Sequence, residues 1–296
     1  MGVKWCKNLI KSHVYWIFIF TFIAIIVYVS YYFATKTHQE NLVGNQDVAK
    51  SWSEGRMPST STTNWHEHVD VMYYINLDHR EDRRKEFLGE MERMGVPSDK
   101  IVRVPAVYKP KQGDWGCSLS HVKTMQMFQE SSYTNCIVFE DDYMFTEDIG
   151  TTNMAFQSFF QEKIPYGCGI HAYSEERRRS SVEYDVCMLS CSVIQSEEVP
   201  NTKTVLKLLE GQTTSGYMVS KTYCPTLLAN YQEGATLIEN SYKEKGKGIE
   251  IQHAFCVDQY WKRLQPLGNW YVFNPKLGKQ RDSFSDIMGG NVKMEV

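Results

Sequence analysis

The sequence predicts a layered α/β domain with a mostly parallel central sheet, preceded by one transmembrane helix. Short runs rich in β-branched and aromatic residues alternate with segments whose apolar residues recur at helical spacing. The run "CIVF" at residues 136–139 is uninterrupted and apolar, as expected of a parallel strand that is buried on both faces. The span from Val14 to Ala34 carries no charge and is long enough to cross a bilayer, which takes about 20 residues.

We interpret the uncharged span as an uncleaved signal-anchor. Aromatic residues crowd both of its ends, as in the aromatic belts of membrane helices. A cleavable signal peptide is the alternative, but its apolar region is usually about 7–15 residues long and ends in a small-residue cleavage site. Lys4, Lys7 and Lys11 precede the span and no acid does, so the positive-inside rule places the N-terminus in the cytosol.

This topology divides the chain into four parts. Residues 1–13 are the cytosolic tail, 14–34 the anchor, 35–68 a flexible stem poor in apolar residues, and 69–296 the folded domain. His66 and His68 fall in the stem, where we interpret them as solvated residues rather than metal ligands.

Composition excludes some classes of function. The 296 residues carry a formal net charge of -3, which argues against a protein built to coat nucleic acid. The eight cysteines include no C-x-x-C pair, so their spacing does not indicate a zinc site. Beyond a membrane some of the cysteines could form disulfides, whose connectivity the sequence does not specify.

The first half of the folded domain reads as strand, helix, strand, helix, strand. "VMYYINL" (71–77) predicts a strand, and residues 79–95 predict a helix with Phe87, Leu88, Met91 and Met94 on one face and Gly95 as C-cap. "IVRVPAV" (101–107) predicts the second strand. A helix follows over 116–131, with Ser118 or Ser120 as N-cap, and "CIVFEDD" (136–142) predicts the third strand.

The second half is less regular. "VCMLSCSVI" (186–194), "GYMVS" (216–220) and "NWYVFNP" (269–275) predict strands, and a helix follows the second of them. The run "EERRRSS" (175–181) is interpreted as a solvated loop. In "FCVDQYWKRLQ" (255–265) a single acid, Asp258, stands beside an apolar stretch.

Three consecutive acids, Glu140, Asp141 and Asp142, end the third predicted strand. Adjacent negative charges repel one another, and burial would raise their pKa values. In open α/β sheets ligands bind beyond the carboxyl ends of the strands, and hard cations such as Mg²⁺ and Mn²⁺ bind carboxylates together with phosphate oxygens. A bound cation would relieve the repulsion and hold a diphosphate, whereas the plainer interpretation is a solvated turn.

The order of several motifs resembles glycosyltransferase family 25, which includes bacterial lipooligosaccharide and procollagen galactosyltransferases. The motifs are "YYINLDHREDRRKEF", "GCSLSH", "IVFEDDYMF", "TTSGYMVSK", "VDQYW" and "NPKLGKQRDSFSDI", from about Val69 to Ile287. The resemblance implies a GT-A-like, Rossmann-like fold, a sugar-nucleotide donor and inversion at the anomeric carbon. By analogy Glu140 and Asp142 occupy the positions of a D-x-D-type motif and bind Mn²⁺ or Mg²⁺, while Asp141 contacts metal or ribose.

Further residues are expected at the nucleotide. Asn76 ends the first strand, and Arg80 and Arg84 are placed to share a helix face that contacts the diphosphate; the alternative is a solvated face paired with neighbouring acids. His121 is expected near the start of its helix, where the dipole favours anions, or else as a buried residue that orders the turn. Gln280 belongs to a basic tail that either closes over the diphosphate or frays.

Asp258 is the expected general base. Its apolar neighbours should raise its pKa and make it a better proton acceptor near neutral pH. The alternative interpretation is an N-cap for the helix that follows.

The sequence therefore favours a metal-dependent, inverting hexosyltransferase, with UDP-galactose as the expected donor and a hydroxyl of a glycan or protein as acceptor. Anchor, stem and large domain match the usual layout of Golgi glycosyltransferases, so we expect a single-pass type II membrane protein with its catalytic domain in the lumen of the endoplasmic reticulum or Golgi. The alternative is a membrane-anchored, non-catalytic glycan-binding protein on the same fold. Phosphoryl transfer is disfavoured because no G-x-x-x-x-G-K-[ST] loop is present.

Overall fold

A computed structural model describes residues 63–161, 183–200, 202–244, 253–285 and 290–292, which all belong to one compact unit spanning residues 56–296. The expected cytosolic tail and anchor, most of the expected stem, and the charge run at 175–181 lie outside the described residues. Within the described ranges, no helix has both the length and the apolar character needed to cross a membrane.

A six-stranded sheet forms the centre of this unit, in the order β2-β1-β3-β6-β5-β7. Its strands are β1 (Val71–Asn76), β2 (Ile101–Pro105), β3 (Asn135–Glu140), β5 (Val186–Glu198), β6 (Val205–Ser220) and β7 (Trp270–Phe273). β1 runs parallel to β2 and β3, and β6 runs antiparallel to its neighbours, so β6 alone is reversed in this sheet. The predicted mostly parallel α/β sheet is confirmed.

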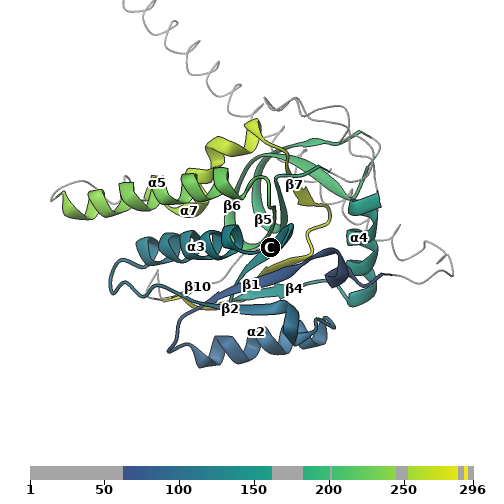
Figure 1. The fold of residues 1–296 in the computed structure, drawn as a ribbon, viewed down its shortest axis with the longest axis horizontal. Helices are drawn as coiled ribbons and strands as arrows, with labels where there is room; N and C mark the ends of the chain where they lie inside the picture. The colour runs from purple at the N-terminus through teal and green to yellow at the C-terminus, as the bar shows by residue number, and fades with distance from the viewer. Residues whose placement is uncertain (1–62, 162–182, 201, 245–252, 286–289, 293–296) are drawn as a thin grey trace, which may run out of the picture. The chain divides into compact units, whose positions relative to one another are not determined.

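One face of the sheet is covered by two helices, α3 (Gly113–Glu130) and α5 (Cys224–Lys243), which lie side by side (Figure 1). Alternate residues of β1 and β3 point to this face, where Tyr73 and Val138 join Met125 and Leu227 in one apolar core. The short α7 (Val257–Tyr260) and the 3₁₀ segment η4 (Trp261–Leu267) pack against α5 and β6. This face therefore holds the helix that carries "SLSH" and the segment that carries Asp258.

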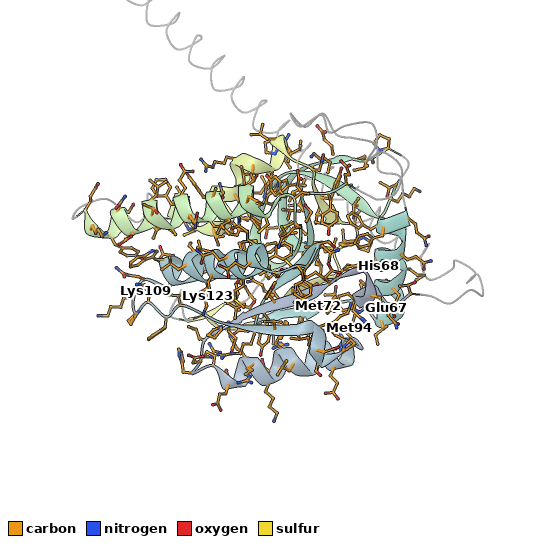
Figure 2. The ribbon with its side chains drawn as sticks, viewed as in Figure 1. Glu67, His68, Met72, Met94, Lys109 and Lys123 are labelled. Carbon is orange, nitrogen blue, oxygen red and sulfur yellow. The ribbon has the colours of Figure 1, made fainter. Side chains whose placement is uncertain are left out.

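The opposite face is covered by α2 (Glu81–Arg93) and α4 (Ile149–Gln161). Tyr74 of β1 stacks on Phe87 of α2, with ring centroids 4.6 Å apart. Met72 and Met94, both fully buried, lie on this side (Figure 2). A small sheet of β4 (Tyr143–Phe145) and β8 (Gly278–Gln280) also belongs to the unit, and β9 (Ser283–Ser285) pairs with β10 (Gly290–Val292).

The helix after β1 agrees with the prediction except on one residue. Phe87 and Met91 are buried, but Leu88 is exposed because it points one residue further around the helix. Gly95 has a φ of 72°, the left-handed conformation that suits glycine just beyond a helix end. The expected C-terminal signal is confirmed.

The start of α3 differs from the prediction. The helix begins at Gly113 after Gln112, so Ser118 and Ser120 lie inside it and neither is the N-cap. Their hydroxyls donate to the carbonyls of Asp114 and Gly116, four residues back. A serine inside a helix can bond back to the carbonyl four residues earlier, so a serine alone does not mark the start of a helix.

Ordered structure begins before Val69. Residues 65–68, which the sequence places in the stem, form the 3₁₀ segment η1 (Trp65–His68); a second such segment, η2 (Ser98–Lys100), precedes β2. Trp65 is fully buried between Phe145 and Phe156, and its indole N–H donates to the carbonyl of Met94. Free thiols are present at Cys117, Cys136, Cys187, Cys191 and Cys224.

Candidate active site

Two parallel strands end at the same edge of the sheet. Ile75 of β1 pairs with Glu140 of β3, so Asn76 lies level with Asp141. β6 runs past this edge in the opposite direction and carries an irregularity there, since Ser190 pairs with Gly216 but Ser192 with Gln212. The residues between Gln212 and Gly216 therefore bulge from the ladder beside the acidic triplet.

Asp141 is held from both sides. The Asn76 side-chain amide donates to its carboxylate at 2.7 Å, and an Arg83 guanidinium nitrogen lies 2.9 Å from its other oxygen. Burial raises the pKa of Asp141, opposed by these two partners. Arg103 donates to the amide oxygen of Asn76, which fixes that side chain in turn. Asn76 and Asp141, each expected near the nucleotide, are thus brought together.

Arg83 is the cation at the triplet, and sequence reasoning missed it. Arg83 lies 3.5 Å from Asp142 as well as 2.9 Å from Asp141. Arg84 is exposed, and Arg80, which precedes α2, pairs with Asp82 at 2.9 Å. Helical spacing could have identified Arg83, because residues four apart lie on the same face of a helix. Arg83 lies on the face of the buried Phe87, whereas Arg84 lies on the face of the exposed Leu88.

Three side chains contact the carboxylate of Glu140. The ring of His121 contacts its Oε1 at 3.2 Å, the hydroxyl of Thr214 donates to the same oxygen, and the amide of Gln280 donates to Oε2 at 3.3 Å. Burial opposes ionisation, but the hydrogen bond and charge interaction with His121 outweigh it, so the pKa of Glu140 is lowered. Gln280 reaches this point because β8 pairs with β4, so residues 278–280 form an ordered strand.

Asp142 is the least satisfied of the three acids. Its Oδ1 is buried and has no hydrogen-bond partner among the described residues. Burial, followed by the negative charge of Glu140, raises the pKa of Asp142 to about 7. A buried carboxylate oxygen without a donor is an open position for a hard cation, so the residues present fit a divalent metal here.

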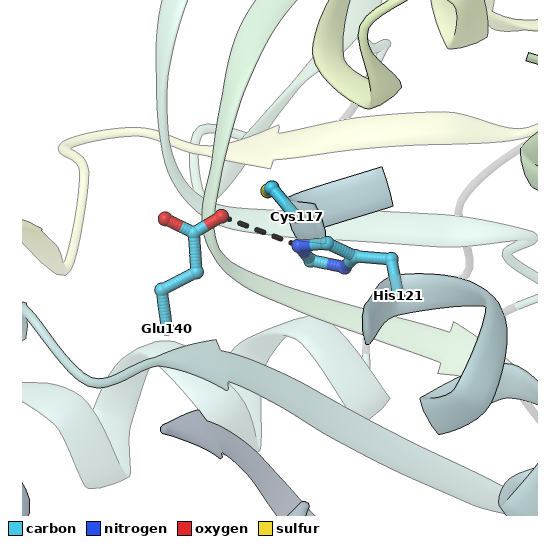
Figure 3. Close-up of side chains that lie close together, drawn as sticks. All are labelled: Cys117, His121 and Glu140. Atoms are coloured by element: carbon cyan, nitrogen blue, oxygen red, sulfur yellow. Dashed lines mark hydrogen bonds and ion pairs between the residues drawn. The ribbon is translucent and has the colours of Figure 1, made fainter. Parts of the chain in front are cut away.

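His121 lies in the middle of α3, so the expected position near a helix start is wrong. The longer helix places His121 fully inside the core, away from the helix dipole. Its Nδ1 lies 2.8 Å from the hydroxyl of Tyr217, while the other nitrogen faces Glu140 (Figure 3). The alternative, a buried histidine that orders its surroundings, matches this geometry.

Asp258 lies in the first turn of α7, whose N-cap is Cys256, so the N-cap alternative is wrong. The backbone N–H of Thr213 donates to its carboxylate at 3.2 Å, as does the Gln259 amide. Burial raises the pKa of Asp258, as expected from its neighbours, and Glu140 adds to the effect.

The bulge on β6 connects the acids. Thr213 has a φ of 87°, a strained value for a β-branched residue, and presents its N–H to Asp258. The next residue, Thr214, presents its hydroxyl to Glu140. Sequence reasoning read this stretch only as the approach to a short strand, because a bulge leaves no simple hydrophobic pattern.

The comparison with protein families agrees with the motif order. Residues 106–240 match the family model described as glycosyltransferase family 25 (LPS biosynthesis protein). Comparison with curated proteins finds no match. Among solved structures, mannose-1-phosphate geranyltransferase from Thermus thermophilus is similar, with 9% identity and a TM-score of 0.35, over 70% of this chain and 73% of that one.

The family match spans α3, β3, the acidic triplet, the bulge on β6 and most of α5. It thus covers the elements that position His121, Glu140 and Asp142. Residues 106–240 carry a family 25 glycosyltransferase domain, and the chain is a glycosyltransferase.

Proposed function

We propose that the chain is a metal-dependent, inverting hexosyltransferase with a GT-A-like fold, which transfers galactose from UDP-galactose to a hydroxyl of a glycan or protein. The observation that carries the proposal is at Asp142: its buried Oδ1 has no donor within the part of the chain that the structure describes, at the strand end where Asp141, Glu140 and Arg83 converge. A family 25 domain covers this edge.

Mn²⁺ or Mg²⁺, held by Asp142 with Glu140 beside it, would stabilise the negative charge that develops on the departing diphosphate. Arg83 supplies the positive charge that keeps Asp141 and Asp142 close together without metal. Asn76 and Asp141 form a rigid hydrogen-bonded pair at the end of β1, suited to orient the ribose or the nucleotide. Arg80, Arg84 and Gln280 stay predicted contacts of the nucleotide.

Asp258 is the proposed general base. The acceptor hydroxyl attacks the anomeric carbon and gives its proton to the Asp258 carboxylate, while the bond to the UDP oxygen breaks and its electron pair leaves with UDP. One displacement of this kind inverts the configuration. A carboxylate with a raised pKa holds such a proton better than an ordinary one, and the Thr213 N–H and Gln259 amide orient it.

We further propose that the enzyme is a single-pass type II membrane protein with its catalytic domain in the lumen of the endoplasmic reticulum or Golgi. The uncharged span from Val14 to Ala34 and the lysines that precede it support this topology.

Donor hydrolysis tests the proposed function. The purified chain is incubated with a panel of sugar nucleotides and Mn²⁺, and released UDP or other nucleotide is measured. We expect hydrolysis of UDP-galactose above that of other donors, abolished by chelator. Turnover that persists in excess chelator contradicts the proposed metal dependence. Faster turnover of another sugar nucleotide contradicts UDP-galactose as the donor.

A further inference from the structure

Three side chains of different chemistry lie close together at the acidic triplet. Cys117 and His121 lie one helical turn apart on α3, and Glu140 approaches from the end of β3 (Figure 3). A sulfur, a ring nitrogen and a carboxylate oxygen, one from each, lie within 4.8 Å of one another. Cys117 has no place in the proposed transfer reaction.

The donor set differs from that of a manganese site. Hard cations such as Mn²⁺ take oxygen ligands, whereas a thiolate together with an imidazole selects softer ions of the zinc class. Zinc held by sulfur and nitrogen in tetrahedral geometry needs those atoms about 3.6 Å apart, from bond lengths of about 2.3 and 2.1 Å. The His121 nitrogen and the Glu140 oxygen are already 3.2 Å apart, and the Cys117 sulfur lies within 4.8 Å of both, so it has to move closer by at most about 1.2 Å.

The second nitrogen of His121 is prepared for such a role. Nδ1 contacts the hydroxyl of Tyr217 at 2.8 Å, and Tyr231 contacts that same hydroxyl at 3.2 Å. All three side chains are buried in the core, which fixes the ring orientation. The two hydroxyls can reverse their hydrogen bonds, so that Nδ1 donates to Tyr217 and Nε2 is free to bind a metal, the usual arrangement behind a metal-binding histidine.

We propose that Cys117, His121 and Glu140 form a second metal site, which binds one zinc-class ion and inhibits sugar transfer. On binding, the thiol of Cys117 loses its proton to solvent and a sulfur–metal bond forms, with no change of oxidation state. The ion occupies Oε1 of Glu140, so this carboxylate oxygen is no longer available to the metal held at Asp142. Zinc-class ions bind mixed nitrogen and sulfur ligands far more tightly than Mn²⁺ does, so excess Mn²⁺ does not displace them.

Metal binding is tested first, without any assay of transfer. The full chain is titrated with Co²⁺, and the near-ultraviolet absorption of a thiolate–cobalt bond is recorded. We expect one equivalent to bind, and Zn²⁺ to displace it. Cys117→Ser should lose the band. Cys256→Ser, at the partly buried N-cap of α7, is the matched control and should keep the band. Retention of the band in Cys117→Ser overturns the site.

A second variant separates loss of a ligand from loss of folding. Tyr217→Phe removes only the hydroxyl behind His121 and should weaken Co²⁺ binding about 10-fold, since such outer partners contribute about 10–100-fold to metal affinity. Thermal unfolding of each variant is measured alongside. Unchanged cobalt affinity in a folded Tyr217→Phe protein contradicts the role assigned to the His121–Tyr217 contact.

Inhibition is tested last and rests on the proposed function. With Mn²⁺ in excess, the Zn²⁺ concentration that halves UDP release should rise about 100-fold in Cys117→Ser, each variant being compared with its own uninhibited rate. If the protein binds Co²⁺ through Cys117 but transfers no sugar, the proposed function fails and the metal site stands. If it transfers sugar and Zn²⁺ inhibits both proteins equally, the inhibitory site is overturned.

Discussion

The two sides of the acidic triplet are built from opposite chemistry. On the side of α2, the guanidinium of Arg83 lies against Asp141 and Asp142. On the side of β6 and α7, neutral groups approach the acids: the hydroxyl of Thr214 at Glu140 and the backbone N–H of Thr213 at Asp258. A cationic side suits a diphosphate, and a side of neutral donors leaves a buried carboxylate ready to accept a proton.

The difference also appears within the triplet. The pKa of Glu140 is lowered, whereas that of Asp142 is raised to about 7, although the two are separated by a single residue. Hydrogen-bond donors converge on Glu140, while Asp142 keeps a buried oxygen without one among the described residues. Environments that give neighbouring carboxyl groups different pKa values are typical of sites in which the two groups have different roles.

Removing the unsatisfied carboxylate should have the largest effect. We expect Asp142→Asn to slow sugar transfer by about 10³-fold, because charge stabilisation at the leaving diphosphate is lost. Chelator should do the same to the unmodified protein, and added Mn²⁺ should restore it. UDP release measures the effect, with the exposed Asp99→Asn as control. If Asp142→Asn turns over normally, Asp142 is not a metal ligand.

The neutral side is tested at Asp258. We expect Asp258→Asn to fold and bind UDP normally but to transfer sugar about 10²-fold more slowly or worse, since an amide accepts no proton. Thermal stability, UDP affinity and turnover are measured on the same preparation. Near-normal turnover would remove Asp258 from the catalytic residues and leave its contact with Thr213 as a structural one.

The cationic side is tested by two adjacent arginines. We expect Arg83→Ala to lower the free energy of unfolding by about 1–3 kcal/mol, because two buried acids lose their cation. Arg84→Ala is the matched control, and its effect should stay within about 0.5 kcal/mol because the residue is exposed. Chemical denaturation measures both. Equal effects would mean that Arg83 does not neutralise the triplet.

Sequence reasoning located the strand ends well. The apolar run before Glu140 and the strand before Asn76 were predicted as strands of a mostly parallel sheet, and in the structure Asn76 bonds to Asp141. This part succeeds because strand pairing and burial follow from a hydrophobic pattern that is local in the chain. The expectation of a raised pKa at Asp258 rested on the same kind of local pattern.

The positions of the residues that sequence reasoning missed depend on how a helix is rotated and on how strands pair. Arg83 and Arg84 have the same chemistry, and only the exact turn of α2 decides which one faces the sheet. His121 was placed too near a helix start because the serines before it resemble caps. The bulge at Thr213 and Thr214 arises from the pairing of β5 with β6, which is absent from either segment alone.

The smallest effect is a pH dependence of stability. A folded-state pKa of about 7 at Asp142 lies above the ordinary value of 3.8 for an aspartate. The folded state therefore binds this proton more tightly, so the stabilisation is complete below the unfolded pKa and is lost as pH rises through 7. With chelator present, the free energy of unfolding should fall between pH 6 and pH 8 by about 1 kcal/mol, because most of one proton is released over this range.

Asp142→Asn isolates this contribution from other groups that titrate in the same range. Asparagine has no proton to release, so its unfolding free energy should vary less with pH, and the variant should exceed the unmodified protein in stability at pH 8. Denaturation curves at several pH values measure the difference, with Asp99→Asn as the control that should follow the unmodified protein. Parallel pH profiles for Asp142→Asn and the unmodified protein would show that Asp142 titrates as an ordinary acid. The contrast between the two sides would then rest on geometry alone, with the Arg83 side still cationic and the Asp258 side still neutral.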